Sequence, residues 1–408
     1  MSTEKFIVRQ PILDPKHKVA GYEFWFQKAD ADTWGDEDLQ HLAMLLAAGF
    51  NDAEAGWQMR ELMIYMNATP AFLGSDAVLG MRPENTVFTL SRTDFASAET
   101  TAAVRRLRGQ GYNISLRDDD LMAQAANLAR CTPMLLQANR IELNANLPDL
   151  DTRVAMIRRI AQPGSKLLVR HVQSWELYER CTALNVGVFA SEVYMSPQPG
   201  TPFKDINPSQ TVIVQLMQLV RQNASVRELE HVMKRDAALS FKLFRYINSV
   251  GFGLGAEIES LRHAVTLLGY KTLYRWLSLL LATASSVKYG AVLMQTAMIR
   301  ARFVELLGQG LMTTNESEDL FVIGLFSMLD RLMGMTIEQV MAKVNLSEPI
   351  TEALLTRTGM YGPFLALAEA CEDLNGNAAQ CADELFLTAR QVNEAQLQAV
   401  SWAQNLGV

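Results

Sequence analysis

Long hydrophobic runs are absent from this sequence, and the longest, near Trp276 to Ala282, is too short to span a bilayer. The opening residues, MSTEKFIVRQ, lack the apolar core of a signal peptide. We therefore expect a cytoplasmic protein that makes no membrane contact. A basic excess is also missing, because the net charge is -7. Direct binding of nucleic acid is accordingly not expected.

Cysteine and histidine are scarce, which removes the usual ligands of a zinc site. The four cysteines, at positions 131, 181, 371 and 381, form no C-x-x-C pair, and the chain has only 5 histidines. We expect the cysteines to be buried and inert, like small apolar residues. An adjacent His-Asp pair, which could hold a metal ion from one helix, occurs nowhere in the sequence.

The composition is that of a folded globular protein, with 49% hydrophobic and 20% charged residues, and 408 residues suggest two domains. The first half alternates short apolar runs with amphipathic stretches such as 36–49 and 97–109. Eight runs are typical of strands: FIVRQPI, VAGYEFWF, LMIYMN, TVFTL, YNISL, ANRIEL, KLLVR and VGVFA. This repetition predicts a parallel sheet closed into a (β/α) barrel, with an open doubly wound sheet as the alternative.

A proline-rich segment, Ser196 to Gln210, separates this half from the rest. After it, apolar residues recur every three to four positions up to the C-terminus. We therefore predict a barrel domain over residues 1–198, a linker over 199–210 and an all-α helical bundle over 211–408.

The segment RQPILDPKHKVAGYEFWFQ, residues 9–27, resembles the start of EAL domains, the cyclic di-GMP phosphodiesterase family. The resemblance covers the first half and implies a barrel whose carboxylates hold two divalent cations. Comparison with the family's motifs assigns a vestigial site to Glu23, Asn67, Asp118, Arg140 at the catalytic lysine position, and Glu142. Trp25 and Gln27 replace the leucine and the arginine that follow the signature glutamate.

Five acidic positions of the family's motifs carry other residues in this chain, namely Thr89, Arg92, Arg117, Arg170 and Gln173. The local formal charge changes from -5 to +3, which should repel divalent cations. The resemblance therefore predicts no metal and no cofactor.

The arginines of this region allow two interpretations. Arg92, Arg117, Arg140 and Arg170 could bind phosphate directly, because guanidinium groups donate paired hydrogen bonds to phosphate oxygens. Alternatively, they pair with Glu23, Asp118 and Glu142 and fill the barrel mouth.

The stretch from Arg245 to Leu281 resembles HDOD domains, which are relatives of HD phosphohydrolases that generally lack the metal-binding His-Asp pair. In FVIGLFSMLDRLMGM, residues 321–335, Ser327 and Met328 occupy the positions of that pair, as a vestigial HD site. His231 and His263 have no carboxylate neighbours at metal-ligand spacing, so we expect core or surface roles for them.

The order of the two regions is similar to that of bacterial EAL-HDOD signalling proteins. This resemblance suggests a non-enzymatic regulatory scaffold in a cyclic di-GMP pathway, acting on a protein partner through its HDOD domain, and a homodimer is left open. A metal-independent receptor for cyclic di-GMP or another phosphate ligand is the second hypothesis. Residual cyclic di-GMP phosphodiesterase activity is the third.

Overall fold

The computed structural model describes most of the chain. The described residues are 5–27, 35–51, 62–118, 128–196, 206–248, 258, 260–284, 287, 289–344 and 346–405. The predicted linker therefore lies mainly outside them, as does the glycine-rich sequence GFGLG at 251–255.

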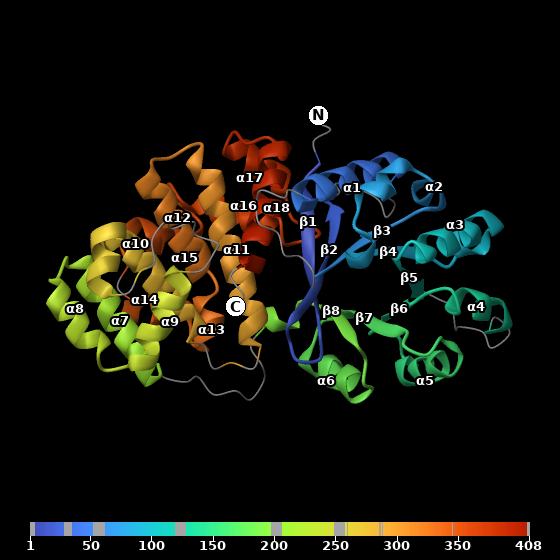
Figure 1. Ribbon diagram of the computed structural model, residues 1–408, viewed down its shortest axis with the longest axis horizontal. Helices are drawn as coiled ribbons and strands as arrows, with labels where there is room; N and C mark the ends of the chain where they lie inside the picture. The colour runs from blue at the N-terminus through green and yellow to red at the C-terminus, as the bar shows by residue number, and fades with distance from the viewer. Residues whose placement is uncertain are drawn as a thin grey trace. The chain divides into compact units, whose positions relative to one another are not determined.

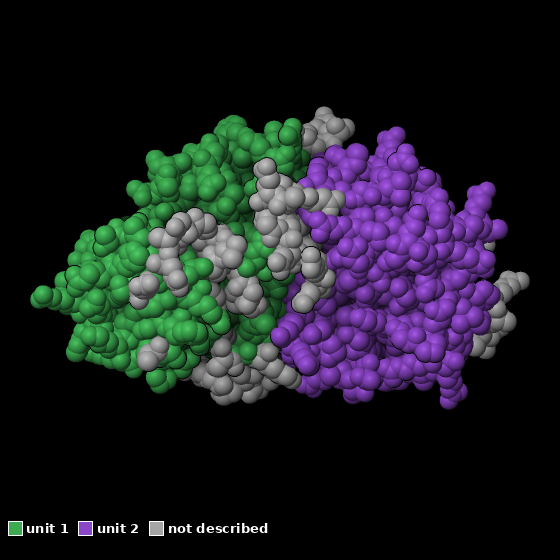
Figure 2. Space-filling view, viewed as in Figure 1, with its two compact units in different colours: residues 1–4, 200–371, 376–408 green, residues 5–199, 372–375 purple. Residues whose placement is uncertain are grey.

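The chain divides into two compact units (Figure 2). One comprises Lys5–Pro199 with Glu372–Asn375, and the other comprises Gly200–Cys371 and Gly376–Val408 with the N-terminal Met1–Glu4. The grouping of Glu372–Asn375 with the first unit has a chemical basis, because the buried Arg9 donates a hydrogen bond of 2.8 Å to Glu372. The exact domain limits remain a prediction.

The first unit is a closed barrel in which eight strands follow one another in chain order (Figure 1). The strands are β1 Ile7–Leu13, β2 Val19–Phe26, β3 Met63–Asn67, β4 Thr86–Ser91, β5 Asn113–Asp118, β6 Arg140–Asn144, β7 Lys166–Val172 and β8 Val188–Ser191. The predicted barrel is confirmed, and the open sheet is not observed. Strands β2 to β8 are parallel, as expected.

Strand β1 differs from the prediction, because it runs antiparallel to both β2 and β8. Only Asp14 to Lys18 connect β1 to β2, and the backbone N–H of Asp14 donates to the Lys18 carbonyl at 2.8 Å. A connection this short permits a hairpin, whereas a parallel pair needs a crossover of a dozen or more residues.

Helices lie outside the barrel strands and cover them (Figure 1). They are α1 Asp36–Asn51, α2 Pro70–Leu73, α3 Ala98–Gly109, α4 Leu128–Leu135, α5 Leu150–Ile160 and α6 Trp175–Ala183. Side-chain caps set some of their starts, since Ser97 accepts from the N–H of Thr100 and Ser174 from that of Leu177. Inside the barrel, a cluster of apolar residues that includes Ile12, Val87 and Leu168 forms the packed floor beneath the polar mouth.

The second unit is all-α in its described part, as predicted. Its helices are α7 Pro208–Arg221, α8 Val226–Met233, α9 Ala237–Ile247, α10 Leu261–Thr283, α11 Gly290–Gln309, α12 Thr314–Phe326, α13 Leu329–Met333, α14 Ile337–Val344, α15 Glu348–Thr356, α16 Gly362–Ala370, α17 Ala378–Glu384 and α18 Ala389–Asn405. A capping box of Asn207 and Gln210 starts α7. Helix α10 is interrupted at Gly269, whose φ of 77° favours glycine.

Helix α11 is buried among its neighbours and packs closely on α12. At Gly324 of α12, an added Cβ would lie 2.6 Å from the Cα of Ala301 in α11. The two backbones can approach this closely only because Gly324 has no side chain.

Two of the expected features can be checked directly. Cys181, Cys371 and Cys381 are buried free thiols, while the side chain of Cys131 lies outside the description. Among the described helices, none combines the length and the apolarity that a membrane crossing requires.

Candidate functional site

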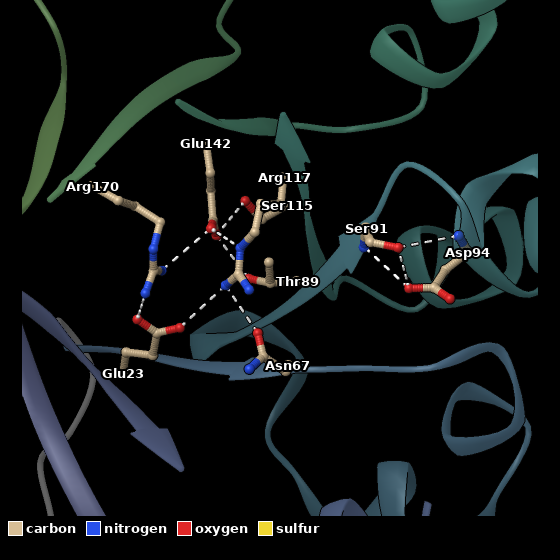
Figure 3. A network of polar contacts seen from close by, with 9 residues as sticks. All are labelled: Glu23, Asn67, Thr89, Ser91, Asp94, Ser115, Arg117, Glu142 and Arg170. Atoms are coloured by element: carbon tan, nitrogen blue, oxygen red, sulfur yellow. Dashed lines mark hydrogen bonds and ion pairs between the residues drawn. The ribbon is translucent and has the colours of Figure 1, made fainter. Parts of the chain in front are cut away.

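The carboxyl ends of the parallel strands bring a set of polar side chains into the mouth of the barrel (Figure 3). They come from β2 to β7 and are Glu23, Asn67, Thr89, Ser115, Arg117, Glu142 and Arg170. Each points inward because alternate residues of a strand face the same side. The register places Arg117 directly beside Glu142 on the neighbouring strand.

Glu142 is at the centre of this network and is almost fully buried. Its Oε1 accepts hydrogen bonds from the hydroxyls of Thr89 at 2.8 Å and Ser115 at 2.9 Å. Its Oε2 accepts from Arg117 Nε at 3.1 Å and from Arg170 Nη1 at 3.3 Å. Burial raises the pKa of Glu142. The two guanidinium groups and the two hydroxyls lower it by a larger amount, so that the pKa falls from 4.5 to about 2. The carboxylate is therefore ionised at neutral pH.

Glu23 completes a ring of four charges. Its Oε2 accepts from Arg170 Nη2 at 2.6 Å, and its Oε1 lies 3.5 Å from Arg117 Nη2. Arg117 Nη2 also donates to the Asn67 side-chain oxygen at 2.9 Å. Burial lowers the pKa of Arg170, but the charges of Glu23 and Glu142 raise it by more. Arg170 is thus permanently charged.

The arginines lie on the solvent side of the carboxylates. The side chains of Arg117 and Arg170 are 24% and 15% exposed, whereas those of Glu23 and Glu142 are 2% and 0% exposed. A solute entering the mouth therefore meets guanidinium groups before it meets carboxylates.

The network bears on the two-cation centre that the EAL resemblance implies. All four oxygens of Glu23 and Glu142 already face hydroxyl or guanidinium donors. Among the described residues, no group of three or more acidic, histidine or cysteine side chains could hold a metal ion. The donors among the described side chains of the mouth therefore do not fit a two-metal centre.

Two of the four predicted anion-binding arginines lie apart from this network. Arg92 follows β4, where the hydroxyl of its neighbour Ser91 donates to Asp94 at 2.6 Å in a separate pair (Figure 3). Arg140 lies deeper in the barrel, two residues before Glu142, with its guanidinium carbon 5.4 Å from the centre of the Tyr65 ring.

Other predicted positions are placed as follows. Asp118 ends β5, but its side chain is not among those described. The motif comparison missed Ser115 as a partner of Glu142. The alternation of Asn113, Ser115 and Arg117 along β5 could have indicated it, because residues two apart share a face. Trp25, two residues after Glu23, is buried.

In the helical unit, Ser327 and Met328 are both buried at the junction of α12 and α13. The Ser327 hydroxyl donates to the Gly324 carbonyl at 2.8 Å and accepts from Arg300 Nη1 at 3.1 Å. An arginine therefore contacts the serine that the sequence comparison predicted at a metal-ligand position of HD enzymes. His231 lies on the exposed surface of α8, and His263 is half-buried on α10.

Comparisons with known proteins identify the helical region. The HDOD domain family matches residues 206–358, so the chain contains an HDOD domain. Cyclic di-GMP phosphodiesterase CdgJ of Vibrio cholerae is 26% identical over 98% of this chain and 93% of its own length. The uncharacterised protein YuxH of Bacillus subtilis is 22% identical over 98% of both chains. The predicted resemblance to EAL-HDOD proteins is confirmed.

The structure of the EAL enzyme Bd1971, bound to cAMP and cyclic di-GMP, is also similar. The match has a TM-score of 0.39 and 13% identity, and it covers 48% of this chain and 62% of that chain.

The comparison with CdgJ corrects one prediction. The chain was expected to be a non-enzymatic scaffold, on the ground that its catalytic carboxylates are replaced. A relative that matches nearly the whole chain is named a phosphodiesterase, which contradicts that expectation. The number of replaced carboxylates was too narrow a basis for predicting the absence of activity, because it considered single motif positions and not the similarity of the whole chain.

Proposed function

We propose that the protein acts in cyclic di-GMP signalling and that the barrel mouth binds this dinucleotide through Arg117 and Arg170. The observation that carries the proposal is the position of the two guanidinium groups, between solvent and the buried Glu23 and Glu142. Guanidinium groups are well suited to phosphate oxygens, and cyclic di-GMP contains two phosphodiester groups.

The charge balance of the mouth supports an anionic ligand. Among the described side chains of the barrel interior, Arg117 and Arg170 at the mouth and Arg140 deeper in the barrel outnumber Glu23 and Glu142 by one positive charge. Arg117 uses its Nε and Nη2 in the network, and no described residue accepts from its Nη1. This nitrogen could donate a hydrogen bond to a phosphate oxygen of the ligand. Such a bond would not displace Glu23 or Glu142 from their contacts.

Hydrolysis of cyclic di-GMP is the second candidate, favoured by the near full-length similarity to CdgJ. We assign no metal-dependent step to the described residues of the mouth, because their donors do not fit a metal pair. The protein contact expected for the HDOD domain and the homodimer remain predictions, and light scattering of the purified chain tests the latter.

Calorimetric titration of the full chain with cyclic di-GMP tests the binding proposal. Arg117→Lys keeps the charge but loses the planar donor pair, so we expect roughly 10-fold weaker binding. Arg180→Lys is the control, because Arg180 forms a surface ion pair with Asp151 in the same unit. Absence of heat with the unaltered protein, or equal affinity in both variants, would refute the proposal.

Chromatography of the reaction products tests hydrolysis in the same samples. The unaltered protein is incubated with cyclic di-GMP and either Mn²⁺, Mg²⁺ or a chelator. Release of the linear dinucleotide above the protein-free rate supports the second candidate. If calorimetry has demonstrated binding and cyclic di-GMP stays intact in all three samples, the protein binds the dinucleotide without hydrolysing it.

A further inference from the structure

Two phenylalanines of the helical unit are the most exposed large apolar side chains among the described residues. Phe386, which follows α17, is 91% exposed, and Phe241 of α9 is 69% exposed. Single exposed apolar side chains are common on protein surfaces. These two differ from the ordinary case because their surroundings carry opposite charge.

The backbone at Phe386 adopts a conformation that favours glycine. Helix α17 ends in a Schellman motif, in which the N–H of Phe386 donates to the Asp383 carbonyl at 3.1 Å. The φ of Phe386 is 56°, in the left-handed region, where an L side chain is strained. Leu387 is buried directly after it and fixes the turn. The motif therefore holds an aromatic ring in solvent at a position where glycine would suit the fold better.

Acidic residues lie beside Phe386. Residues 376–394 contain three acidic residues and one basic residue, a net charge of -2. The basic residue, Arg390, already pairs with Glu394 at 2.7 Å. Asp383 and Glu384 are exposed in the last turn of α17, where the helix dipole favours basic residues. We call Asp383, Glu384 and Phe386 the acidic corner.

Basic residues lie beside Phe241. Residues 226–248, which include α8 and α9, contain five basic and three acidic residues, a net charge of +2. Leu243 lies on the buried side of α9, whereas Phe241 and Lys242 are exposed. This helix therefore presents an aromatic ring and an ammonium group together.

The turn before α9 adds to this positive surface. Lys234 is exposed in it, two residues before Asp236. The Ser209 hydroxyl lowers the pKa of Asp236, and the charge of Lys242 lowers it further, so Lys242 lies near this turn. We call Lys234, Phe241 and Lys242 the basic face.

The acidic corner and the basic face lie apart in the helical unit. In Figure 1, α9 is at the lower end of this unit and α17 is at its upper end. The two surfaces of one unit therefore do not meet each other, but each can meet its counterpart on another molecule.

We propose that the acidic corner of one copy of the chain binds the basic face of a second copy. Their opposite net charges favour this pairing and disfavour contact between two like surfaces. Phe386 is the anchor of the contact, because its backbone is already fixed and the ring loses little conformational freedom on binding. Phe241 offers an aromatic partner for that ring. The contact does not depend on cyclic di-GMP.

Sedimentation velocity of the full chain over a wide range of protein concentration tests the proposal. We expect the average mass to rise with concentration, and to fall when salt screens the charges. Phe386→Gly should weaken self-association by roughly 10-fold, because it removes the aromatic anchor. Glycine suits the left-handed backbone at this position, so the melting temperature of this variant should not fall.

Charge reversal identifies the two surfaces that meet. Lys242→Glu and Glu384→Lys should each weaken self-association, and the protein with both changes should regain it, because the opposite charges then face each other again. Lys16→Glu, on the exposed connection between β1 and β2, is the control for charge and should have no effect. Leu79→Ala is the control for exposed apolar surface, since Leu79 is 65% exposed in the barrel unit.

Three results would overturn the proposal. The first is a chain that remains monomeric at every concentration. The second is self-association that Phe386→Gly leaves unchanged or that the control variants weaken equally. The third is failure of the double charge reversal to restore an association that both single reversals have weakened.

Discussion

The four-charge ring in the barrel makes a quantitative prediction for the substitution Arg170→Met. Methionine fills much of the volume of arginine but donates no hydrogen bond. Glu23 Oε2 loses its 2.6 Å contact, and Glu142 loses one of its two guanidinium partners. Two buried carboxylates then share the single charge of Arg117.

The size of the effect follows from burial and from the pKa of Glu142. Folding lowers that pKa from 4.5 to about 2, which corresponds to about 3 kcal/mol of stabilisation of the ionised form. Arg170 is one of the four groups that supply this stabilisation, together with the second guanidinium and the two hydroxyls. Removal of one partner from a buried ion pair usually costs about 3 to 5 kcal/mol, and the low exposure of Arg170 places this case in that range.

Native-state hydrogen exchange measures this loss within the barrel. Because the chain has two units, a single global unfolding free energy is poorly defined, whereas peptides from β6 and β7 report on the barrel alone. Arg180→Met, at the surface ion pair with Asp151, is the control and should leave these peptides unchanged. Equal exchange in the two variants would show that the ring does not stabilise the barrel.

The pH dependence provides an independent check. Since folding lowers the pKa of Glu142, its contribution is complete above about pH 4.5 and is lost as pH falls towards about 2. In the Arg170→Met protein the pKa of Glu142 should rise, so this loss should begin at a higher pH. Identical acid unfolding profiles of the two proteins would contradict the reasoning.

Three further substitutions test the packing and the network. Gly324→Ala should destabilise the helical unit by about 1 to 3 kcal/mol, because the added methyl group meets the backbone of α11. Gly310→Ala is the control and should not destabilise it, because nothing lies within 4 Å of the added methyl group. Urea unfolding compares the two variants. Ser115→Ala should raise the pKa of Glu142 and cost about 1 kcal/mol, which acid unfolding followed by circular dichroism measures. Arg275→Leu should cost about 3 kcal/mol by calorimetric unfolding, because buried Glu305 keeps only Arg302 of its two guanidinium partners and the guanidinium carbon 3.7 Å from the centre of a phenylalanine ring is lost.

Most of the fold could be predicted because its signals are local. The apolar runs matched the strands to within two residues at each end, and the helical period identified the second unit. The direction of β1 was missed even though its signal is also local. The five residues Asp14 to Lys18 are too few for a crossover helix, so the spacing itself indicated a hairpin.

The site was only partly predictable because its contacts are not local. Motif comparison located Glu23 and Glu142, but Glu23 and its partner Arg170 are 147 residues apart and meet only when the barrel closes. Sequence alone could not decide which arginines would join the carboxylates. Arg92 and Arg140 carry the same charge but lie beyond hydrogen-bonding reach of either glutamate, one past its strand end and one deeper in the barrel.

The arrangement around Glu142 determines what the barrel mouth can bind. Glu142 accepts from Arg117 and Arg170. A carboxylate that accepts from two guanidinium groups has few lone pairs left for a cation, whereas Arg117 Nη1, from which no described residue accepts, can still donate. The mouth therefore favours an anion, and a ligand gains most when it adds a bond to this nitrogen without displacing the carboxylates. Affinity should then depend on the geometry of the arginines more than on their net charge, which is why lysine substitutions that keep the charge are the informative ones.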